Sequence, residues 1–147
     1  MVRSTVWNDV NQGNRVKTKT IKQSVEFNAS PHEVFECLMD SKKHSKFSGD
    51  AAKISRSVGG KISAYSGYIS GENLKLVPDK KIVQSWHASD WPNGHFSKAT
   101  FALSKTKNGT RLTFTQTGVP EEFFEDISLG WYEHYWDKMK LVFHQKN

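Results

Sequence analysis

The sequence predicts an α+β fold, in which a curved antiparallel sheet of about six strands wraps around one long carboxy-terminal helix. Apolar and polar residues alternate over 17–29 and over most of 51–118, which is typical of strands with one buried face. From residue 121 onward, apolar residues recur about every four positions instead, which indicates an amphipathic helix. Since the sheet is the only predicted element large enough to cover that helix, we expect the sheet to bend around it.

The 147 residues fit a single domain preceded by a polar arm. The arm is expected at residues 1–16, where Val6 and Trp7 are the prominent apolar side chains, and the domain at residues 17–147. Leaving a Trp side chain in water is unfavourable. We therefore expect the arm either to pack back onto the domain or to become ordered on a partner, and the sequence leaves both open.

Local patterns predict the first strand and the helices that follow it. The apolar side chains of residues 17–29 fall on one face of a strand. The segment Ser30-Pro31-His32-Glu33 combines a cap, a proline at the first helical position and a glutamate three residues after the cap. One short helix therefore begins there, and a second is expected around residues 40–47.

The remaining strands are predicted between residues 51 and 118. Gly67 and Gly71 fall inside this region, which indicates a bulge or the close approach of another backbone. The alternation places the strands at Ile54 and at residues 61–70, 73–77, 81–88, 95–105 and 110–118. Gly, Pro and Asn favour tight turns, and they mark three: Gly59-Gly60, Pro78-Asp79-Lys80 and Asn108-Gly109.

The carboxy-terminal helix is expected over residues 121–145. Acidic side chains gather in its first turns and lysines near its end, as the helix macrodipole favours. Gly130 interrupts it at a cost of about 1 kcal/mol relative to Ala, which indicates that another group packs closely there. The apolar stripe consists of Phe123, Ile127, Trp131, Tyr135, Met139 and Val142.

The cysteine content and the apolar runs predict a cytoplasmic location. Cys37 is the single cysteine, so no internal disulfide forms, and its place on a short apolar helix predicts a buried, inert thiol. Residues 1–10 lack the apolar run of a signal peptide. No segment approaches the roughly 18 apolar residues that a membrane span needs, so a membrane is not expected as a partner.

The net charge of +6 favours either a solvated lysine-rich face or an acidic partner. Basic residues gather early in the chain, over residues 42–46 and at Lys80-Lys81. None of these groups interleaves with aromatic residues at a spacing suited to stacking bases. Nucleic acid is therefore not expected as a partner.

Several ordered segments carry a family resemblance, which runs from Ile21 to the end of the chain. They lie at 27–35, 59–62, 67–72, 76–86, 91–96, 108–110, 118–120 and 130–131. The most distinctive is Trp91-Pro92-Asn93-Gly94-His95-Phe96, which matches the pattern Trp-Pro-x-Gly-His-Phe. The chain thus resembles the carboxy-terminal domain of the activators of the Hsp90 ATPase, within the START-like or helix-grip superfamily.

The resemblance implies a co-chaperone module that binds Hsp90 and favours the ATPase-competent state of that chaperone. It also implies that the partner surface is acidic, since Hsp90 is an acidic chaperone. Two-domain activators also carry an amino-terminal domain that grips the chaperone's middle segment, and residues 1–16 are too short to replace it. We therefore expect Hsp90 binding more firmly than strong ATPase stimulation. The loop from Trp91 is either a contact surface or a cap on the core. The residues predicted to contact Hsp90 are Trp91, Asn93, His95, Phe96, Lys80 and Lys81.

A second hypothesis is a carrier of a small hydrophobic ligand, held between the sheet and the carboxy-terminal helix as in other helix-grip proteins. Gln84 and Gln116 would then either contact the ligand or bond to backbone groups or water. A continuous cavity of about 300 Å³ or more that reaches the surface would favour this hypothesis. Its predicted lining is Ile62, Gln84, Trp86, Phe101, Phe114, Gln116, Trp131 and Tyr135.

An enzyme of the same fold is the third hypothesis, and the sequence does not favour it. The six histidines do not pair at metal-binding spacing, and the acidic residues of 121–126 are explained by a helix start. No nucleophile elbow or phosphate-binding loop is present. We therefore predict no catalytic residue, no metal and no cofactor.

Overall fold

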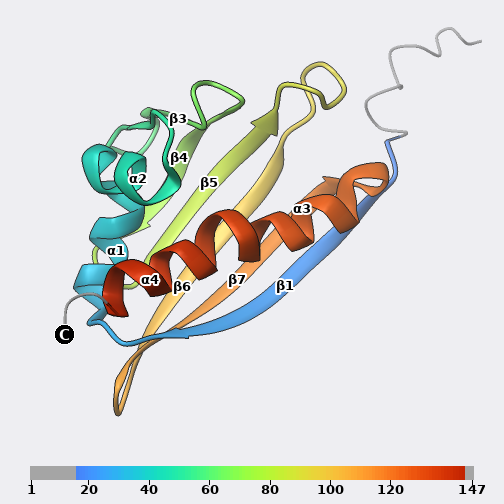
Figure 1. Ribbon diagram of the computed structural model, residues 1–147. Coiled ribbons are helices and arrows are strands. Elements are labelled where there is room, and N and C mark those ends of the chain that lie inside the picture. Colours follow the sequence, from blue (N-terminus) through green and yellow to red (C-terminus); the bar gives the residue numbers. More distant parts are fainter. Residues whose placement is uncertain (1–15, 145–147) are drawn as a thin grey trace, which may run out of the picture.

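The computed structural model describes residues 16–144 and confirms the α+β fold (Figure 1). One seven-stranded antiparallel sheet, in the order β1-β7-β6-β5-β4-β3-β2, curves around the carboxy-terminal helix. The predicted arm lies outside the described residues except for its last position. The strands are β1 Thr18–Phe27, β2 Lys53–Ile54, β3 Lys61–Ala64, β4 Ile69–Val77, β5 Lys81–Ala88, β6 Ser97–Thr106 and β7 Gly109–Pro120. The helical segments are α1 Pro31–Met39, α2 Ser41–Ser48, η3 Glu121–Phe123, α3 Phe124–Trp131, η4 Tyr132–Trp136 and α4 Asp137–His144.

The strands predicted at residues 61–70 and 73–77 are divided at a different place in the structure, where β3 ends at Ala64 and β4 begins at Ile69. Tyr65, Ser66 and Gly67 adopt positive φ angles of 52°, 57° and 95° and form a turn between β3 and β4. The apolar alternation continues on both sides of this turn, so the pattern alone does not reveal it. The predicted close approach at Gly71 is confirmed, since a Cβ atom there would lie 1.8 Å from the Ser85 carbonyl oxygen.

The hairpin between β6 and β7 differs from its prediction by one residue. Gly109 pairs with Thr106, so the two-residue loop is 107–108, and Gly109 itself begins β7. A Cβ atom at Gly109 would lie 2.1 Å from the Phe27 carbonyl oxygen. This glycine is therefore required by a close approach to the end of β1 rather than by the turn.

The predicted helix start is confirmed in detail. The Glu33 N–H donates to Ser30 Oγ at 3.1 Å, and the Ser30 N–H donates to Glu33 Oε1 at 2.9 Å, which completes a capping box. The side chain of Asp40 then caps α2 by accepting from the Lys43 N–H. These two short helices cover one end of the sheet, beside α4 (Figure 1).

The carboxy-terminal helix is continuous from Glu121 to His144, but η4 is a π-helical turn. A π turn takes five residues between bonded groups, and here the Asp137 N–H donates to the Tyr132 carbonyl oxygen. This turn accommodates the four-residue spacing of the stripe, which a straight α-helix does not follow. Two buried side chains of this helix were missed by the stripe prediction, Trp136 in η4 and Phe143 in α4.

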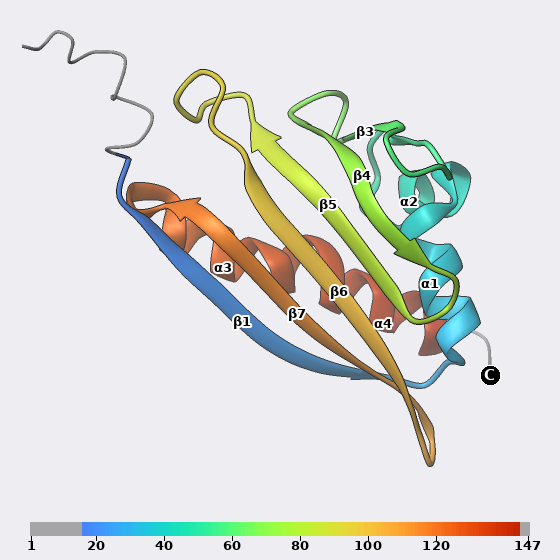
Figure 2. The same cartoon turned by 180° about the vertical axis from the view of Figure 1, so that it is seen from behind.

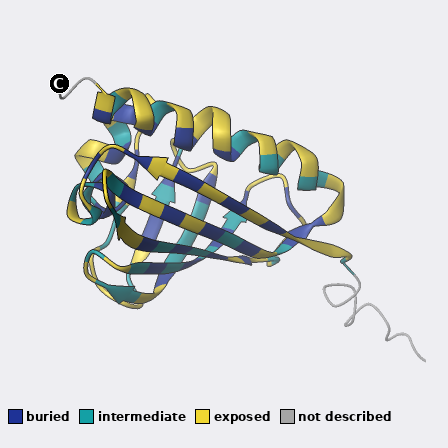
Figure 3. Cartoon of the chain, turned by 90° about the horizontal axis from the view of Figure 1, so that it is seen from below, coloured by how far each residue is buried: buried dark blue, intermediate teal, exposed yellow. Residues whose placement is uncertain are grey.

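The core lies between the inner face of the sheet and this helix. Buried and exposed residues alternate along the strands, and the helix turns its exposed face outward (Figure 3). None of the helices formed by residues 16–144 covers the outer face of the sheet (Figure 2). At the centre, the Trp131 ring stacks on the Trp136 ring, with their centroids 5.4 Å apart. The centroid of the Trp131 ring also lies 4.2 Å from the centroid of the Phe114 ring.

Candidate functional site

The two ends of the molecule differ in what closes them. We call the end that carries α1, α2 and the β4–β5 turn the basic end. The other, which we call the open end, carries the β3–β4 turn, the loop of residues 89–96 and α3 (Figures 1 and 2). Strand β5 runs from one end to the other over eight residues, which span roughly 23 Å at the usual rise of a strand.

Between the two ends, side chains fill the interior. The remaining space next to Ile62, Gln84 and Phe101 is only about 10 Å³, and Phe114 is fully buried. These four residues were predicted to line a ligand cavity, and they are packed core residues instead. The reason is the number of aromatic rings that the sheet and the helix bring together.

The buried glutamines hold the indole rings in place. The Trp86 Nε1–H donates to Gln84 Oε1 at 2.9 Å, and Gln84 Nε2 donates to Asn73 Oδ1 at 3.0 Å. In the same way, Trp131 Nε1–H donates to Gln116 Oε1 at 2.8 Å. Gln116 in turn donates to a serine hydroxyl, that of Ser97. The protein groups that bond to both glutamines are thus side chains, whereas the sequence left open a ligand on one hand and backbone groups or water on the other.

A groove of about 520 Å³ opens at the open end, between the carboxy-terminal helix and the ends of β4 and β5. Four of the predicted cavity residues do line it, namely Trp86, Gln116, Trp131 and Tyr135. Its volume lies within the range of known ligand sites. The predicted cavity is therefore replaced by a groove that reaches the surface at one end.

The wall and rim of this groove are fixed by hydrogen bonds. The Tyr65 hydroxyl donates to the His134 carbonyl oxygen at 2.8 Å, which ties the β3–β4 turn to the helix. The Tyr68 hydroxyl donates to Asp90 Oδ1 at 2.8 Å. Partial burial, and then this bond and the charge of Asp90, raise the pKa of Tyr68 to about 12. Both phenols therefore stay protonated and keep donating at neutral pH, since burial also raises the pKa of Tyr65.

The loop of residues 91–96 is both cap and surface. Trp91 is only 6% exposed, so its predicted role as an exposed contact is wrong, and it closes the core instead. Its Nε1 atom is buried without a hydrogen-bond partner among the described residues. His95 is half-buried and donates from Nε2 to the Gly118 carbonyl oxygen at 2.8 Å. Asn93 and Phe96 remain outside, and Phe96 is 51% exposed.

Lys80 and Lys81 lie at the basic end, one strand length from that loop. The turn that carries them is fixed to α1, since His32 Nδ1 lies 2.9 Å from Asp79 Oδ1. The six residues predicted to contact Hsp90 therefore form two separate patches. The two patches are close in the sequence but far apart in space, because β5 runs across the whole molecule between Lys80 and the loop of residues 91–96.

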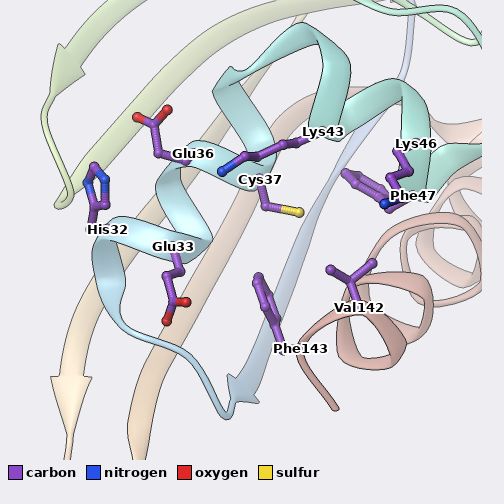
Figure 4. A pocket seen from close by; sticks show the side chains of 9 residues that line it. All are labelled: His32, Glu33, Glu36, Cys37, Lys43, Lys46, Phe47, Val142 and Phe143. Atoms are coloured by element: carbon purple, nitrogen blue, oxygen red, sulfur yellow. The ribbon is translucent and has the colours of Figure 1, made fainter. Parts of the chain in front are cut away.

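A second groove lies at the basic end, between α1, α2 and α4, and its volume is about 390 Å³ (Figure 4). The sequence does not reveal this groove, because its walls lie about a hundred positions apart in the chain. The lysine cluster of residues 42–46 is the only signal that pointed towards it. The lining residues are His32, Glu33, Glu36, Cys37, Lys43, Lys46, Phe47, Val142 and Phe143.

Cys37 is buried, as predicted. Burial raises the pKa of its thiol to about 12, although Lys43 acts in the opposite direction. Little thiolate exists at neutral pH, so this cysteine is a poor nucleophile. Within residues 16–144, no group of three or more His, Cys, Asp or Glu side chains is placed to hold a metal ion. Over the same residues, no helix has the length and apolar character to cross a membrane.

Comparison with known proteins places this chain in a family. The family model described as "Activator of Hsp90 ATPase homolog 1-like protein" matches residues 28–144. A Dictyostelium discoideum protein named as an activator of 90 kDa heat shock protein ATPase homolog is 35% identical over 127 residues, covering 86% of this chain and 33% of the relative. The human homolog 1 of that name is 30% identical over 131 residues, covering 89% of this chain and 39% of the relative.

Solved structures show the same fold. A crystal structure described as an HSP90 activator from Plasmodium falciparum superposes with a TM-score of 0.78 at 26% identity, covering 84% of this chain and 94% of the other. The Aha1 dimer from Colwellia psychrerythraea shows the same fold, with a TM-score of 0.74 at 20% identity and coverage of 85% and 96%. The chain spans 33–39% of the length of the two curated relatives. It belongs to the activator of Hsp90 ATPase homolog 1-like family and has the helix-grip fold.

Proposed function

We propose that this chain is a co-chaperone module that binds Hsp90 and favours its ATPase-competent state by binding that state better. The observation that carries the proposal is the family match over residues 28–144, together with relatives named as activators of this ATPase. In this proposal the chain contributes no catalytic residue. A cytoplasmic location remains the expectation from its single cysteine.

The basic end is the docking surface in this proposal. Lys43, Lys46 and Lys80 are exposed there, and the groove between the helices has Phe47 and Phe143 among its lining residues. Complementary charge speeds the encounter with an acidic partner, while buried apolar contacts supply most of the affinity. Asn93 and Phe96, at the open end, form a separate predicted contact that is tested on its own.

Calorimetry with purified Hsp90, with and without nucleotide, tests the proposal. We expect Lys43→Glu with Lys46→Glu to weaken binding about tenfold at low salt. The matched control is Lys22→Glu with Lys98→Glu, which changes the charge equally on the outer face of the sheet and should bind nearly as well as the unmodified chain. No binding tighter than about 100 μM at low salt would contradict the proposal.

Two further measurements separate its parts. Phe96→Ala tests the loop, and unchanged affinity would remove Asn93 and Phe96 from the contact surface. The ATPase turnover of Hsp90 with this chain alone tests stimulation independently of binding. Binding without a rise in turnover would leave an Hsp90-binding module and remove the activator role.

A second candidate function is the carrier of a small hydrophobic ligand, and the groove of about 520 Å³ favours it. Two tryptophans that line the groove, Trp86 and Trp131, make ligand entry visible as a change in fluorescence. Saturable binding of octyl glucoside, a neutral apolar probe, is the expected result. A fluorescence signal that never saturates would contradict this function.

A further inference from the structure

The groove at the open end is acidic although the chain as a whole is basic. The formal net charge is +6, yet none of the described residues that line the groove is a lysine or an arginine. The carboxylates that line it are those of Asp90, Asp126 and Glu133, and all three residues are exposed. Asp90 comes from the loop after β5, and Asp126 and Glu133 come from the carboxy-terminal helix, so both of these elements contribute negative charge to the groove.

The walls of the groove are aromatic. The Trp131 ring centroid lies 4.8 Å from that of Trp86 and 4.6 Å from that of Tyr135, and two further tyrosines, Tyr65 and Tyr68, line the groove near its mouth. The faces of such rings attract organic cations. Lys19 Nζ lies over the ring of Phe124, and neither of these two residues lines the groove.

We propose that this groove selects an organic cation with an apolar body, of the class of protonated or quaternary alkylamines. The proposal rests on the second candidate function, that the groove takes a small hydrophobic ligand. The apolar body lies against Trp86, Trp131 and Ile127, and the cationic head lies at the rim among the carboxylates. An anion there meets three carboxylates and no lysine or arginine of the lining, whose one basic side chain among the described residues is that of His134. A metal ion is not the fitting occupant, since these carboxylates are not grouped to hold one.

Three probes with the same alkyl chain test the inference: octyltrimethylammonium, octyl glucoside and octyl sulfate, each below its critical micelle concentration. Calorimetry on the full chain should give at least about tenfold tighter binding for the cation than for the glucoside, and the weakest binding for the sulfate. The preference should shrink as salt is added, since exposed charges are screened. Circular dichroism at each titration end point checks that the chain stays folded.

A pair of variants separates the rim from the net charge. Asp126→Asn with Glu133→Gln should remove most of the preference for the cation and leave the glucoside affinity unchanged. The matched control is Glu122→Gln with Glu125→Gln, on the same helix and outside the groove lining, which should keep the preference. An equal loss in both variants overturns the proposal.

The probes also separate this inference from the function on which it rests. Binding of the glucoside with no preference for the cation overturns the inference and leaves the carrier function standing. Binding of none of the three probes overturns both, and unfolding by the cation alone counts as no binding.

Discussion

The basic end and the open end are built from the same sheet and the same helix, but only one of them is sealed by further helices. At the basic end α1 and α2 pack beside α4, and Met139 and Phe143 are buried. At the open end, no helix within the described residues 16–144 covers α3 in this way, and Phe123 and Ile127 stay half-buried beside the groove. The same apolar stripe is thus packed under further helices at one end and partly exposed beside a groove at the other.

The largest expected effect tests this comparison directly, with a Phe to Ala substitution at each end. Phe143→Ala should destabilise the fold by about 3–5 kcal/mol, because it empties a buried site beside Phe27. Phe123→Ala should cost about 1 kcal/mol, because its half-buried ring already borders the groove. Urea unfolding measures both, and equal losses would show that the two ends are packed alike.

The glutamines sharpen the comparison between the packed centre and the groove. Gln84→Leu should cost about 2–3 kcal/mol, since the Trp86 indole N–H and the Asn73 amide then lose their buried partner. Gln116→Leu should cost less, about 1 kcal/mol, since Gln116 lines the groove whereas Gln84 does not. Urea unfolding measures both losses of stability. A larger loss for Gln116→Leu than for Gln84→Leu would contradict the conclusion that Gln116 is the glutamine on the groove side.

A pH dependence should arise at the basic end. His44 is buried, with Nδ1 donating to the Leu38 carbonyl oxygen and the Tyr135 hydroxyl donating to Nε2. Burial lowers its pKa below the ordinary value of 6.5, although the bond to Leu38 acts against this shift. The unfolded chain therefore binds a proton at His44 more readily than the folded chain does. The stability that neutral His44 contributes is complete above the pKa of the unfolded state, and it is lost as the pH falls through the pKa of the folded state.

We expect the free energy of unfolding to fall by about 1 kcal/mol between pH 7.5 and pH 5.5. The lowered pKa of Asp40 acts in the same direction but in a more acidic range, so it does not obscure this window. Urea titrations at the two pH values test the prediction. The variant His44→Phe serves as the control, and a fall of the same size in that variant would assign the effect to another group.

The smallest expected effect concerns Gly130 in the groove wall. A Cβ atom there would meet only the His134 side chain, at 3.6 Å, which is ordinary contact. The close packing predicted for this glycine is therefore not found, and Gly130→Ala should raise stability by up to about 1 kcal/mol. Thermal unfolding would show a higher midpoint, and a lower one would indicate that the groove needs the glycine.

Local chemistry made much of the fold predictable. The Ser30–Glu33 capping box and the bounds of β5 were read correctly, because caps and strand alternation depend on neighbouring residues. The turn at residues 65–68 was missed, because Tyr65 and Ser66 adopt positive φ without being glycines. Local patterns also assigned the carboxy-terminal stripe, but not the π turn that buries Trp136.

The sequence by itself determined the element order, the buried faces and, through the Trp91–Phe96 segment, the family. Only the tertiary structure decided that Trp91 is buried, that Phe96 lies a strand length from Lys80, and that the interior is filled while a groove lies at each end. The physical reason is that periodicity tells which face of an element is buried, whereas the curvature of the sheet and the packing of distant segments decide which residues meet.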